Sequence, residues 1–339
     1  MNATMSLDPK KHYPVMLNQV LSIISPQHGG TFIDCTFGGG GYSEEILKYK
    51  NTKVFALDRD RLVIKHADYL KEKFPKRFIF FKDKFSSLEK IIQKNIKPKA
   101  IIFDLGLSSL QLSDQERGFS FKSENSLSME MGINKYSAYD VVNHLDKKTL
   151  TSIIKVLGDE KEGKNIANYI VNYRKKKPIN NSNELSVIIK NAKKKYNNYK
   201  KNPATKTFQA IRIFVNQELT ELVLALKAAT KLLSEGGILL VVTFHSLEDK
   251  IVKNFFNFYS NLRNKPSRYF PSYEEKTILF NLKNKKPIQP DDSEIKNNIR
   301  SRSAKLRYAI RNDKEFNSLE EFERKFQNYT ELEGMKVWA

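Results

Sequence analysis

Short apolar runs alternate with helical segments in the N-terminal third of the chain. Four such runs occupy 31–35, 53–58, 77–81 and 100–106. Segments with helical character separate them, at 43–50, 61–74 and 86–95. Continuous apolar runs joined by helices are typical of parallel strands that are buried on both faces. The pattern therefore predicts a doubly wound α/β sheet.

This alternation stops after the fourth run. From 137 to 201 the pattern is helical, and no convincing strand interrupts it. Apolar strands return at 236–244 and 304–310, with a helix at 247–259. We therefore expect one sheet domain formed by 1–112 and 203–339, interrupted by an inserted, all-helical substrate-recognition subdomain at 113–202.

The chain is strongly basic. Its 339 residues include 59 Lys or Arg and 38 Asp or Glu, which gives a formal net charge of +21. Such an excess predicts a polyanionic partner, either nucleic acid or an acidic membrane surface. The densest lysine runs, at 174–177 and 193–201, also fit the codon usage of an AT-rich genome. No apolar run approaches the ~18 residues that span a bilayer, which excludes a membrane-spanning protein. We expect nucleic acid and no membrane as the partner.

The cysteine content and the N-terminal segment indicate the cellular compartment. Cys35 is the single cysteine, which excludes an intrachain disulfide and a cysteine-ligated zinc site. We expect no metal. The N-terminal segment lacks the ~7–15-residue apolar stretch of a secretory signal. These features predict a protein of a reducing compartment, the cytoplasm.

A glycine-rich turn joins the first strand to its helix. Residues 38–41 are four consecutive glycines, which let the backbone approach a ligand closely. The second strand ends on Asp58, where a carboxylate can accept both ribose hydroxyls of an adenosine cofactor. A nicotinamide dinucleotide and S-adenosylmethionine both fit these two features. The unspaced glycines and the further strand-end acids Asp34 and Asp104 favour S-adenosylmethionine, because acids would repel a pyrophosphate but attract an ammonium and a sulfonium.

Near the fifth strand, a short polar string allows two interpretations. His245, Ser246 and Asp249 suggest a hydrolase, but they are close together in sequence and no Gly-x-Ser-x-Gly motif is present. The simpler interpretation is a helix cap, with Ser246 as N-cap and Asp249 at the third helical position.

The helix that begins near Pro203 has two stripes. The apolar one is ordinary core, formed by Phe208, Ile211, Val215, Leu219 and Leu222. The polar one is either solvated or faces a cleft that holds RNA, and contains Thr205, Gln209, Arg212 and Asn216. Phosphate contacts are expected from the basic insertion and from Arg300, Arg302, Lys305 and Arg307.

Several long strings resemble one family. They are HYPVML (12–17), DCTFGGGGYS (34–43), DLGLSSLQL (104–112), PATKTFQA (203–210) and RSAKLR (302–307). The similarity is collinear from about His12 to Arg311. On these strings the chain is identified as a member of the bacterial 16S ribosomal RNA cytosine-N4 methyltransferases, the MraW family.

This resemblance implies a Rossmann-like class I S-adenosylmethionine-dependent methyltransferase. Its substrate would be the decoding-site cytosine of 16S rRNA within the 30S subunit, and its cofactor S-adenosyl-L-methionine. The cofactor contacts would fall on Gly40, Gly41, Tyr42, Asp58, Phe85, Asp104 and Gln111. By analogy with amino-methyltransferases of DNA, the residues bordering the reacting methyl would be Asp104, Ser108 and Ser109.

The chain departs from the family pattern at several positions, and two segments among them bear on the site. Tyr42 stands where the family usually has His, which suggests a backbone contact only. The string Ser128-Met129-Glu130-Met131 replaces Asp-Met-Arg-Met, which removes one arginine from a possible RNA contact.

Two other classes of function compete with this hypothesis. A catalytically silent, basic RNA-binding or assembly factor on the same fold is disfavoured by the retained glycines, Asp58, Asp104 and Gln111. A Rossmann-type dehydrogenase is disfavoured by the glycine spacing. The sequence leaves open whether the protein is a monomer or a homodimer.

Overall fold

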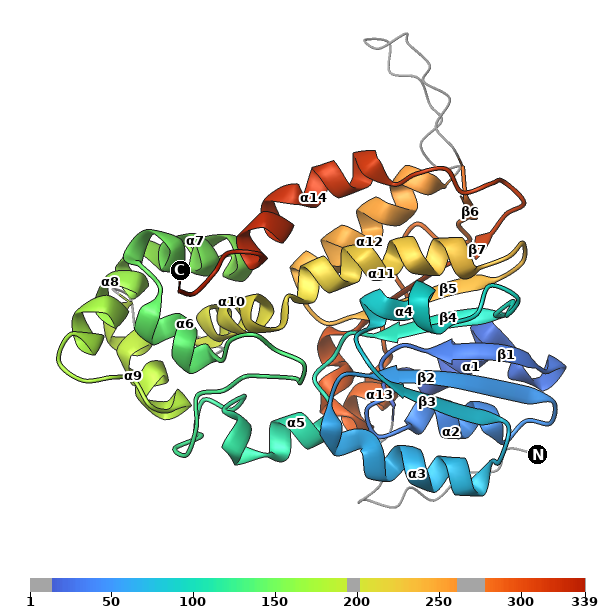
Figure 1. Ribbon diagram of the computed structural model, residues 1–339, viewed down its shortest axis with the longest axis horizontal. Coiled ribbons are helices and arrows are strands. Elements are labelled where there is room, and N and C mark those ends of the chain that lie inside the picture. The colour runs from blue at the N-terminus through green and yellow to red at the C-terminus, as the bar shows by residue number, and fades with distance from the viewer. Residues whose placement is uncertain (1–13, 194–201, 261–277, 339) are drawn as a thin grey trace, which may run out of the picture. The chain divides into compact units, whose positions relative to one another are not determined.

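The computed structural model describes residues 14–193, 202–260 and 278–338 (Figure 1). These form two compact units, one of Met1–Ser109 with Leu226–Asn317 and one of Leu110–Ala225 with Ser318–Ala339. The insertion expected at 113–202 lies within the second unit. Part of the lysine run at 193–201 lies outside the described residues. Within the described part, no helix is both long and apolar enough to cross a membrane.

The first unit contains a mixed sheet (Figure 1). In the described part of the chain its strand order is β3-β2-β1-β4-β5-β7-β6. The strands are β1 (Gly30–Asp34), β2 (Thr52–Asp58), β3 (Phe78–Lys82), β4 (Ala100–Asp104), β5 (Ile238–Thr243), β6 (Phe280–Asn281) and β7 (Lys305–Arg311). β1 to β5 are parallel, and β7 runs antiparallel to both β5 and β6. Six strands were predicted to within about two residues, and the two-residue β6 was not.

Helices cover this sheet because its central strands are apolar throughout. Phe32, Ile102 and Val241 on β1, β4 and β5 are fully buried, as expected for parallel strands packed on both faces. The covering helices include α1 (Leu17–Ile24), α2 (Gly41–Leu47), α3 (Ile64–Lys73), α4 (Leu88–Ile91), α12 (Ser246–Tyr259) and α13 (Asp292–Asn297). The doubly wound sheet predicted from the alternation is confirmed.

The second unit is helical in its described residues. Its helices are α5 (Ser109–Ser113, which starts in the first unit), α6 (Ala138–His144), α7 (Lys147–Gly158), α8 (Gly163–Arg174), α9 (Ser182–Ala192), α10 (Thr205–Asn216) and α14 (Glu320–Glu333). The boundary between the units falls within α11 (Glu218–Leu232). α10 packs against α6, α7 and α14, and its predicted apolar stripe is buried. α10 ends at Asn216, and its C-cap Gln217, with a φ of 53°, breaks the predicted single helix, so Leu219 and Leu222 of the stripe lie on α11.

Candidate active site

The carboxyl ends of β1, β2 and β4 lie side by side in the sheet. The strand order reverses between β1 and β4, and ligands of open α/β sheets bind at such a switch point. Asp34, Asp58 and Asp104 are the last residues of these three strands. The sheet therefore brings the three predicted acids to the same edge.

Asp58 is tied to the glycine-rich turn. One of its carboxylate oxygens accepts from the Gly38 N–H at 2.7 Å, and the other accepts from the Asp60 N–H at 2.9 Å. These bonds orient the carboxylate and leave each oxygen with further acceptor capacity for ribose hydroxyls. The structure thus places Asp58 against the turn, where the sequence predicts the cofactor.

Open space lies over this turn at Gly39. A Cβ built there meets no heavy atom within 4 Å, whereas a Cβ at Gly40 would lie 2.8 Å from the Phe37 ring. Gly40 also has a φ of 80° and precedes α2, of which Gly41 is the first residue. A turn without side chains, with acids around it, fits the methionyl end of S-adenosylmethionine.

Asp34 binds the residues on both sides of the glycine-rich turn. It is fully buried, and its carboxylate accepts from the Ser43 hydroxyl at 2.7 Å and from the Thr36 N–H at 3.2 Å. Thr36 in turn accepts the Asp104 N–H at 2.7 Å. Asp34 is therefore a structural acid that also adds negative charge to the edge.

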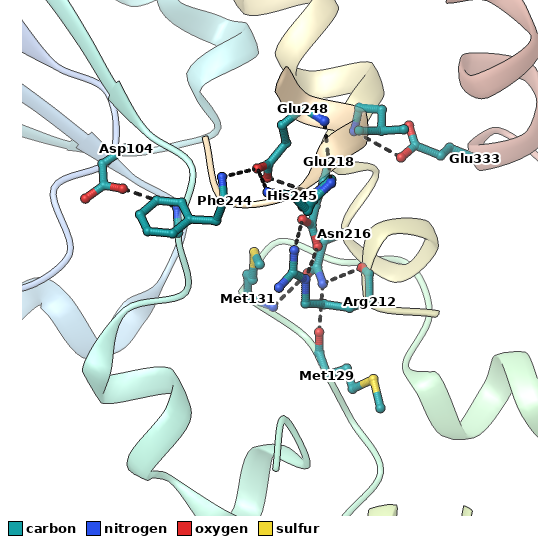
Figure 2. A network of polar contacts seen from close by, with 12 residues as sticks. Asp104, Met129, Met131, Arg212, Asn216, Glu218, Phe244, His245, Glu248 and Glu333 are labelled. Carbon is teal, nitrogen blue, oxygen red and sulfur yellow. Dashed lines mark hydrogen bonds and ion pairs between the residues drawn. The ribbon is translucent and has the colours of Figure 1, made fainter. Parts of the chain in front are cut away.

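Asp104 is half-buried at the end of β4. Its carboxylate accepts from the Gly106 N–H at 3.3 Å. The ring of Phe244 packs so closely on Gly106 that a Cβ there would lie 2.8 Å from it. Figure 2 shows Phe244 beside Asp104. Gly106, which binds the Asp104 carboxylate, is thus packed against the segment that follows β5.

Burial raises the pKa values of all three acids. The pKa of Asp34 rises to about 6, that of Asp58 to about 6 and that of Asp104 to about 7. In each case loss of solvent is the main cause, and the charge of Asp34 adds to the shift at Asp58 and Asp104. Three crowded carboxylates favour a cationic ligand, which would lower all three pKa values.

We expect cofactor binding to release protons near neutral pH. The acids bind protons in the free protein as the pH falls through 7 to 6, and a cationic ligand expels them, so affinity for S-adenosylmethionine should fall below about pH 6. Free of cofactor, the raised pKa values favour folding at acidic pH; that contribution is fully present below about pH 4 and is lost as the pH rises from there through the folded pKa values of about 6 to 7.

Calorimetry in buffers of different ionisation enthalpy measures this proton release. S-adenosylhomocysteine is the matched control, because it lacks the sulfonium and should release fewer protons. An affinity for both ligands that stays constant between pH 5.5 and 8 would contradict the expectation.

Substitution of Gly40 should affect stability, whereas substitution of Gly39 should affect cofactor binding. Gly40→Ala should destabilise the fold by about 1–3 kcal/mol, because it combines a positive φ with a clash against Phe37. Gly39→Ala should leave the unfolding transition in place but weaken cofactor binding, because the new methyl group enters the open space. Urea unfolding and calorimetry test the pair; a Gly39→Ala variant with unchanged cofactor affinity would show that the ligand lies elsewhere.

Two further predicted cofactor contacts, Tyr42 and Phe85, lie in the first unit. The Tyr42 side chain is buried; its hydroxyl donates to the Val15 carbonyl and also interacts with Asp104, lowering the pKa of that acid. The Tyr42 side chain is thus engaged within the protein, and its backbone contact to the cofactor stays a prediction. Phe85 follows β3, half-buried, with its ring edge-on to Phe103 at 5.7 Å.

The serines and Gln111 follow β4. Ser108 lies near the glycine-rich turn, because a Cβ built on Gly38 would lie 3.8 Å from the Cβ of Ser108. Ser109 is the first residue of α5, and Gln111 is buried on that helix in the second unit. Of the predicted set, Asp58, Asp104, Ser108 and the glycines come together within the first unit.

The cap of α12 differs from the prediction. His245, not Ser246, is the N-cap, and Glu248, not Asp249, is the third helical residue. The Glu248 carboxylate accepts from the N–H groups of Phe244 and His245 at 2.8 and 3.2 Å, as Figure 2 shows. The sequence signal for this capping box is Glu three residues after the cap, and Glu248 was missed for that role.

Asp249 instead neutralises two of the predicted phosphate contacts. It accepts from Arg307 Nε at 2.8 Å and Lys305 Nζ at 3.0 Å. Burial acts to raise the pKa of Asp249, but these bonds together hold it below its usual value. The Arg307 side chain is nine-tenths buried, so the prediction that it contacts phosphate is wrong; its role is structural.

A polar pocket of about 340 Å³ lies beside this cap, in the first unit. Lys305 lines it together with the exposed Arg302. The N-terminal residues of α12 form another wall, and Gln289 and Pro290 complete it. Arg302 lies just before β7, the neighbour of β5, and Lys305 is its first residue. Arg302, together with the ammonium donors of Lys305 that do not bind Asp249, can hold a phosphate group.

The polar stripe of α10 proves to be partly structural. Asn216 is fully buried; its amide accepts the Met131 N–H and donates to the Met129 carbonyl, both at 2.8 Å (Figure 2). Arg212 forms a bidentate ion pair with Glu218, with both contacts at 2.8 Å. Both side chains are engaged within the protein, so neither can hold RNA in the way that the sequence suggested. The other two residues of the stripe, Thr205 and Gln209, are half-buried.

The loop that departs from the family pattern is held by its main chain. The Glu130 carbonyl accepts from Arg117, and Asn216 binds Met129 and Met131 on either side. The Glu130 carboxylate accepts from the Ser128 hydroxyl at 2.7 Å. Glutamate at this position is therefore compatible with the loop conformation.

Comparison with known proteins places this geometry in a family. The model of the "MraW methylase family" matches residues 9–312. Proteins named "Ribosomal RNA small subunit methyltransferase H" are 44% identical in Wolbachia sp. subsp. Drosophila simulans (87% of this chain, 97% of the relative) and 42% identical in Afipia carboxidovorans (91% and 92%). The counterpart in Rickettsia canadensis is 43% identical, over 88% of this chain and 97% of the relative.

Solved structures show weaker similarity. An rRNA methylase from Streptococcus thermophilus has a TM-score of 0.38 at 10% identity, covering 87% of this chain and 96% of that one. A Streptococcus mutans protein solved with S-adenosylhomocysteine has a TM-score of 0.39 at 13% identity, covering 91% and 99%. The identity to the curated relatives and the extent of the family match are decisive: the chain belongs to the MraW methylase family.

Proposed function

We propose that this protein transfers the methyl group of S-adenosylmethionine to the exocyclic N4 of the decoding-site cytosine of 16S rRNA. The observation that carries the proposal is the set of acids at the ends of β1, β2 and β4 around a glycine turn, in a member of the MraW methylase family. The curated relatives are named for methylation of small-subunit ribosomal RNA. The site of action would be the cytoplasm.

The geometry supports the proposed cofactor contacts of Asp58, the glycine-rich turn and Phe85. Asp58 is oriented by Gly38 and would accept the ribose hydroxyls, while the open space at Gly39 leaves room for the methionyl end beside the backbone of Gly40 and Gly41. Phe85, braced by Phe103, would lie against the adenine. Bound there, the cofactor would supply an electrophilic methyl group. The role of Gln111 is carried over from the family alone.

Cytosine N4 is a poor nucleophile because its lone pair is conjugated into the ring. The protein must therefore align N4 with the methyl group and accept hydrogen bonds from the amino group. Burial raises the pKa of Asp104 to about 7 in the free protein, and the cationic cofactor would lower it, so near neutral pH the Asp104 carboxylate would be ionised and able to accept such a bond. Ser108 lies near the same turn, and Ser109 begins the helix that follows. We propose these three as the residues that border N4.

The target base must also leave its stack, which costs a few kcal/mol. The pocket lined by Arg302 and Lys305 is the proposed phosphate contact that holds the strand while this happens.

Methyl transfer to ribosomal particles tests this function. Labelled S-adenosylmethionine is incubated with the protein and 30S subunits that lack the modification, and in parallel with naked 16S rRNA. We expect N4-methylcytidine in the nucleoside digest, with the particle as the better substrate. Bound cofactor without transfer to either substrate would instead favour the assembly-factor hypothesis.

A further inference from the structure

A groove lies between α8 and α9 in the second unit. Its volume is about 320 Å³. The side chains that line it come from only these two helices: Tyr169 and Tyr173 from α8, and Glu184, Val187, Ile188 and Asn191 from α9. It belongs wholly to the helical unit and shares no residue with the strand-end site.

The groove exposes apolar and aromatic surface. Tyr169 is 43% exposed and Val187 is 46% exposed. Tyr169 and Tyr173 are four residues apart on α8, so both rings lie on the same helix face. Val187 and Asn191 have the same spacing on α9. An apolar floor with two aromatic rings and an amide at its edge is therefore open to a ligand.

The single acid of the groove is neutralised. Glu184 accepts from the Tyr173 hydroxyl and pairs with Lys177 Nζ at 2.9 Å. Lys177 Nζ also lies 5.5 Å from the centre of the Tyr173 ring. These contacts fix the Tyr173 ring and remove the charge that would otherwise repel an anionic ligand.

The charge around the groove selects the class of ligand. Residues 163–192, which span both helices and their connection, contain six Lys or Arg and one acid. Lys164, Lys175 and Lys176 are exposed. A basic surface around exposed aromatic rings is the arrangement that binds single-stranded nucleic acid, with the cations on phosphates and the rings on bases.

We propose that the α8–α9 groove binds an unpaired base of the RNA substrate, at a subsite separate from the one that receives the target cytosine. Tyr169 stacks on the base, Asn191 hydrogen-bonds to its edge, and Lys175 and Lys176 contact the adjoining phosphates. The proposal rests on the proposed function in one respect, that the substrate is RNA.

Binding of the full chain to a fluorescein-labelled single-stranded RNA of about 12 nucleotides tests this subsite. Tyr169→Ala should weaken binding about tenfold and leave the slope of log K against log salt unchanged, because stacking releases no counterions. Tyr169→Phe should retain the affinity. Tyr69→Ala on α3, where the tyrosine is 52% exposed, is the matched control and should bind like the unaltered chain.

Substitution of the two lysines should instead change the salt dependence of RNA binding. Lys175→Ala and Lys176→Ala should each reduce the salt slope by about 0.7. Methyl transfer to 30S subunits by the same preparations should show a raised KM and an unchanged kcat for Tyr169→Ala. Absence of transfer by the unaltered chain would count against the proposed function alone, since the RNA-binding comparison does not depend on catalysis.

Two outcomes would overturn the proposal. The first is a Tyr169→Ala variant that binds the RNA as tightly as the unaltered chain. The second is an unaltered chain that sediments as a dimer and becomes monomeric on Tyr169→Ala with RNA affinity unchanged, which would assign the groove to contacts between copies.

Discussion

Asp58→Ala is expected to weaken S-adenosylmethionine binding by a factor on the order of 100 or more. Both oxygens of this carboxylate are oriented by backbone N–H groups, of Gly38 and Asp60. The substitution removes the acceptor of both ribose hydroxyls, and each charged hydrogen bond is worth ~1.5–3 kcal/mol. Isothermal calorimetry with S-adenosylmethionine measures the loss directly.

Two further variants separate binding from folding. Asp58→Asn keeps an acceptor oxygen for the turn but loses the charge, so its affinity should lie between those of the unaltered chain and Asp58→Ala. Asp60→Asn changes a neighbouring acid whose carboxylate accepts from the Leu62 N–H at 3.0 Å, and should bind cofactor nearly normally. Equal losses in all three variants would mean that the turn has collapsed and that Asp58 has no special role.

Asn216→Ala is expected to give the largest loss of stability, about 3 kcal/mol in the free energy of unfolding. The Asn216 amide is fully buried and bonds to the backbone of Met129, Met131 and Arg212. Alanine leaves these groups buried without a partner, and each costs about 1–3 kcal/mol. Urea unfolding followed by circular dichroism measures the change in midpoint.

The same measurement has a matched control on α8. Asn172 is exposed, so Asn172→Ala removes no buried bond and should change stability by about 0.5 kcal/mol or less. Asn216→Asp should be destabilising as well, because its oxygens would face the carbonyls of Met129 and Arg212. If Asn216→Ala unfolds at the same urea concentration as Asn172→Ala, the structural role of Asn216 is refuted.

The sheet could be predicted because its strands are short apolar runs between helices. The position of the acids at the ends of these strands could also be predicted, because the carboxyl ends of parallel strands lie at the same edge of a sheet. By contrast, β6 contains only Phe280 and Asn281, too few residues for any period. Such a strand forms because β7 offers it an open edge.

Polar side chains were harder to assign than apolar ones. The pattern of α10 could not distinguish solvated or RNA-facing polar groups from buried ones, and Asn216 is buried because a loop 85 residues away in sequence donates to it. Arg307 was misassigned for the same reason, as Asp249 lies 58 residues away. Burial and partners of this kind are decided by tertiary contacts.

The C-terminal helix α14 has an apolar repeat that is legible in the sequence. Phe322 and Phe326 repeat at helical spacing and are buried. At the end of this helix Glu333 accepts from the N–H groups of Leu219 and Thr220 at 3.0 and 2.7 Å. Burial raises the pKa of Glu333 to about 8. α14 is thereby joined to the start of α11 within the second unit.

The most direct test of the account is methylation of the decoding-site cytosine by the unaltered chain and by Asp104→Ala. Undermethylated 30S subunits receive labelled S-adenosylmethionine, and the 16S rRNA is digested and analysed position by position. The account predicts N4-methylcytidine at that one position with the unaltered chain. With Asp104→Ala it predicts none, in a protein whose unfolding transition is retained. Methylation at another atom or position, or full activity of Asp104→Ala, would contradict it.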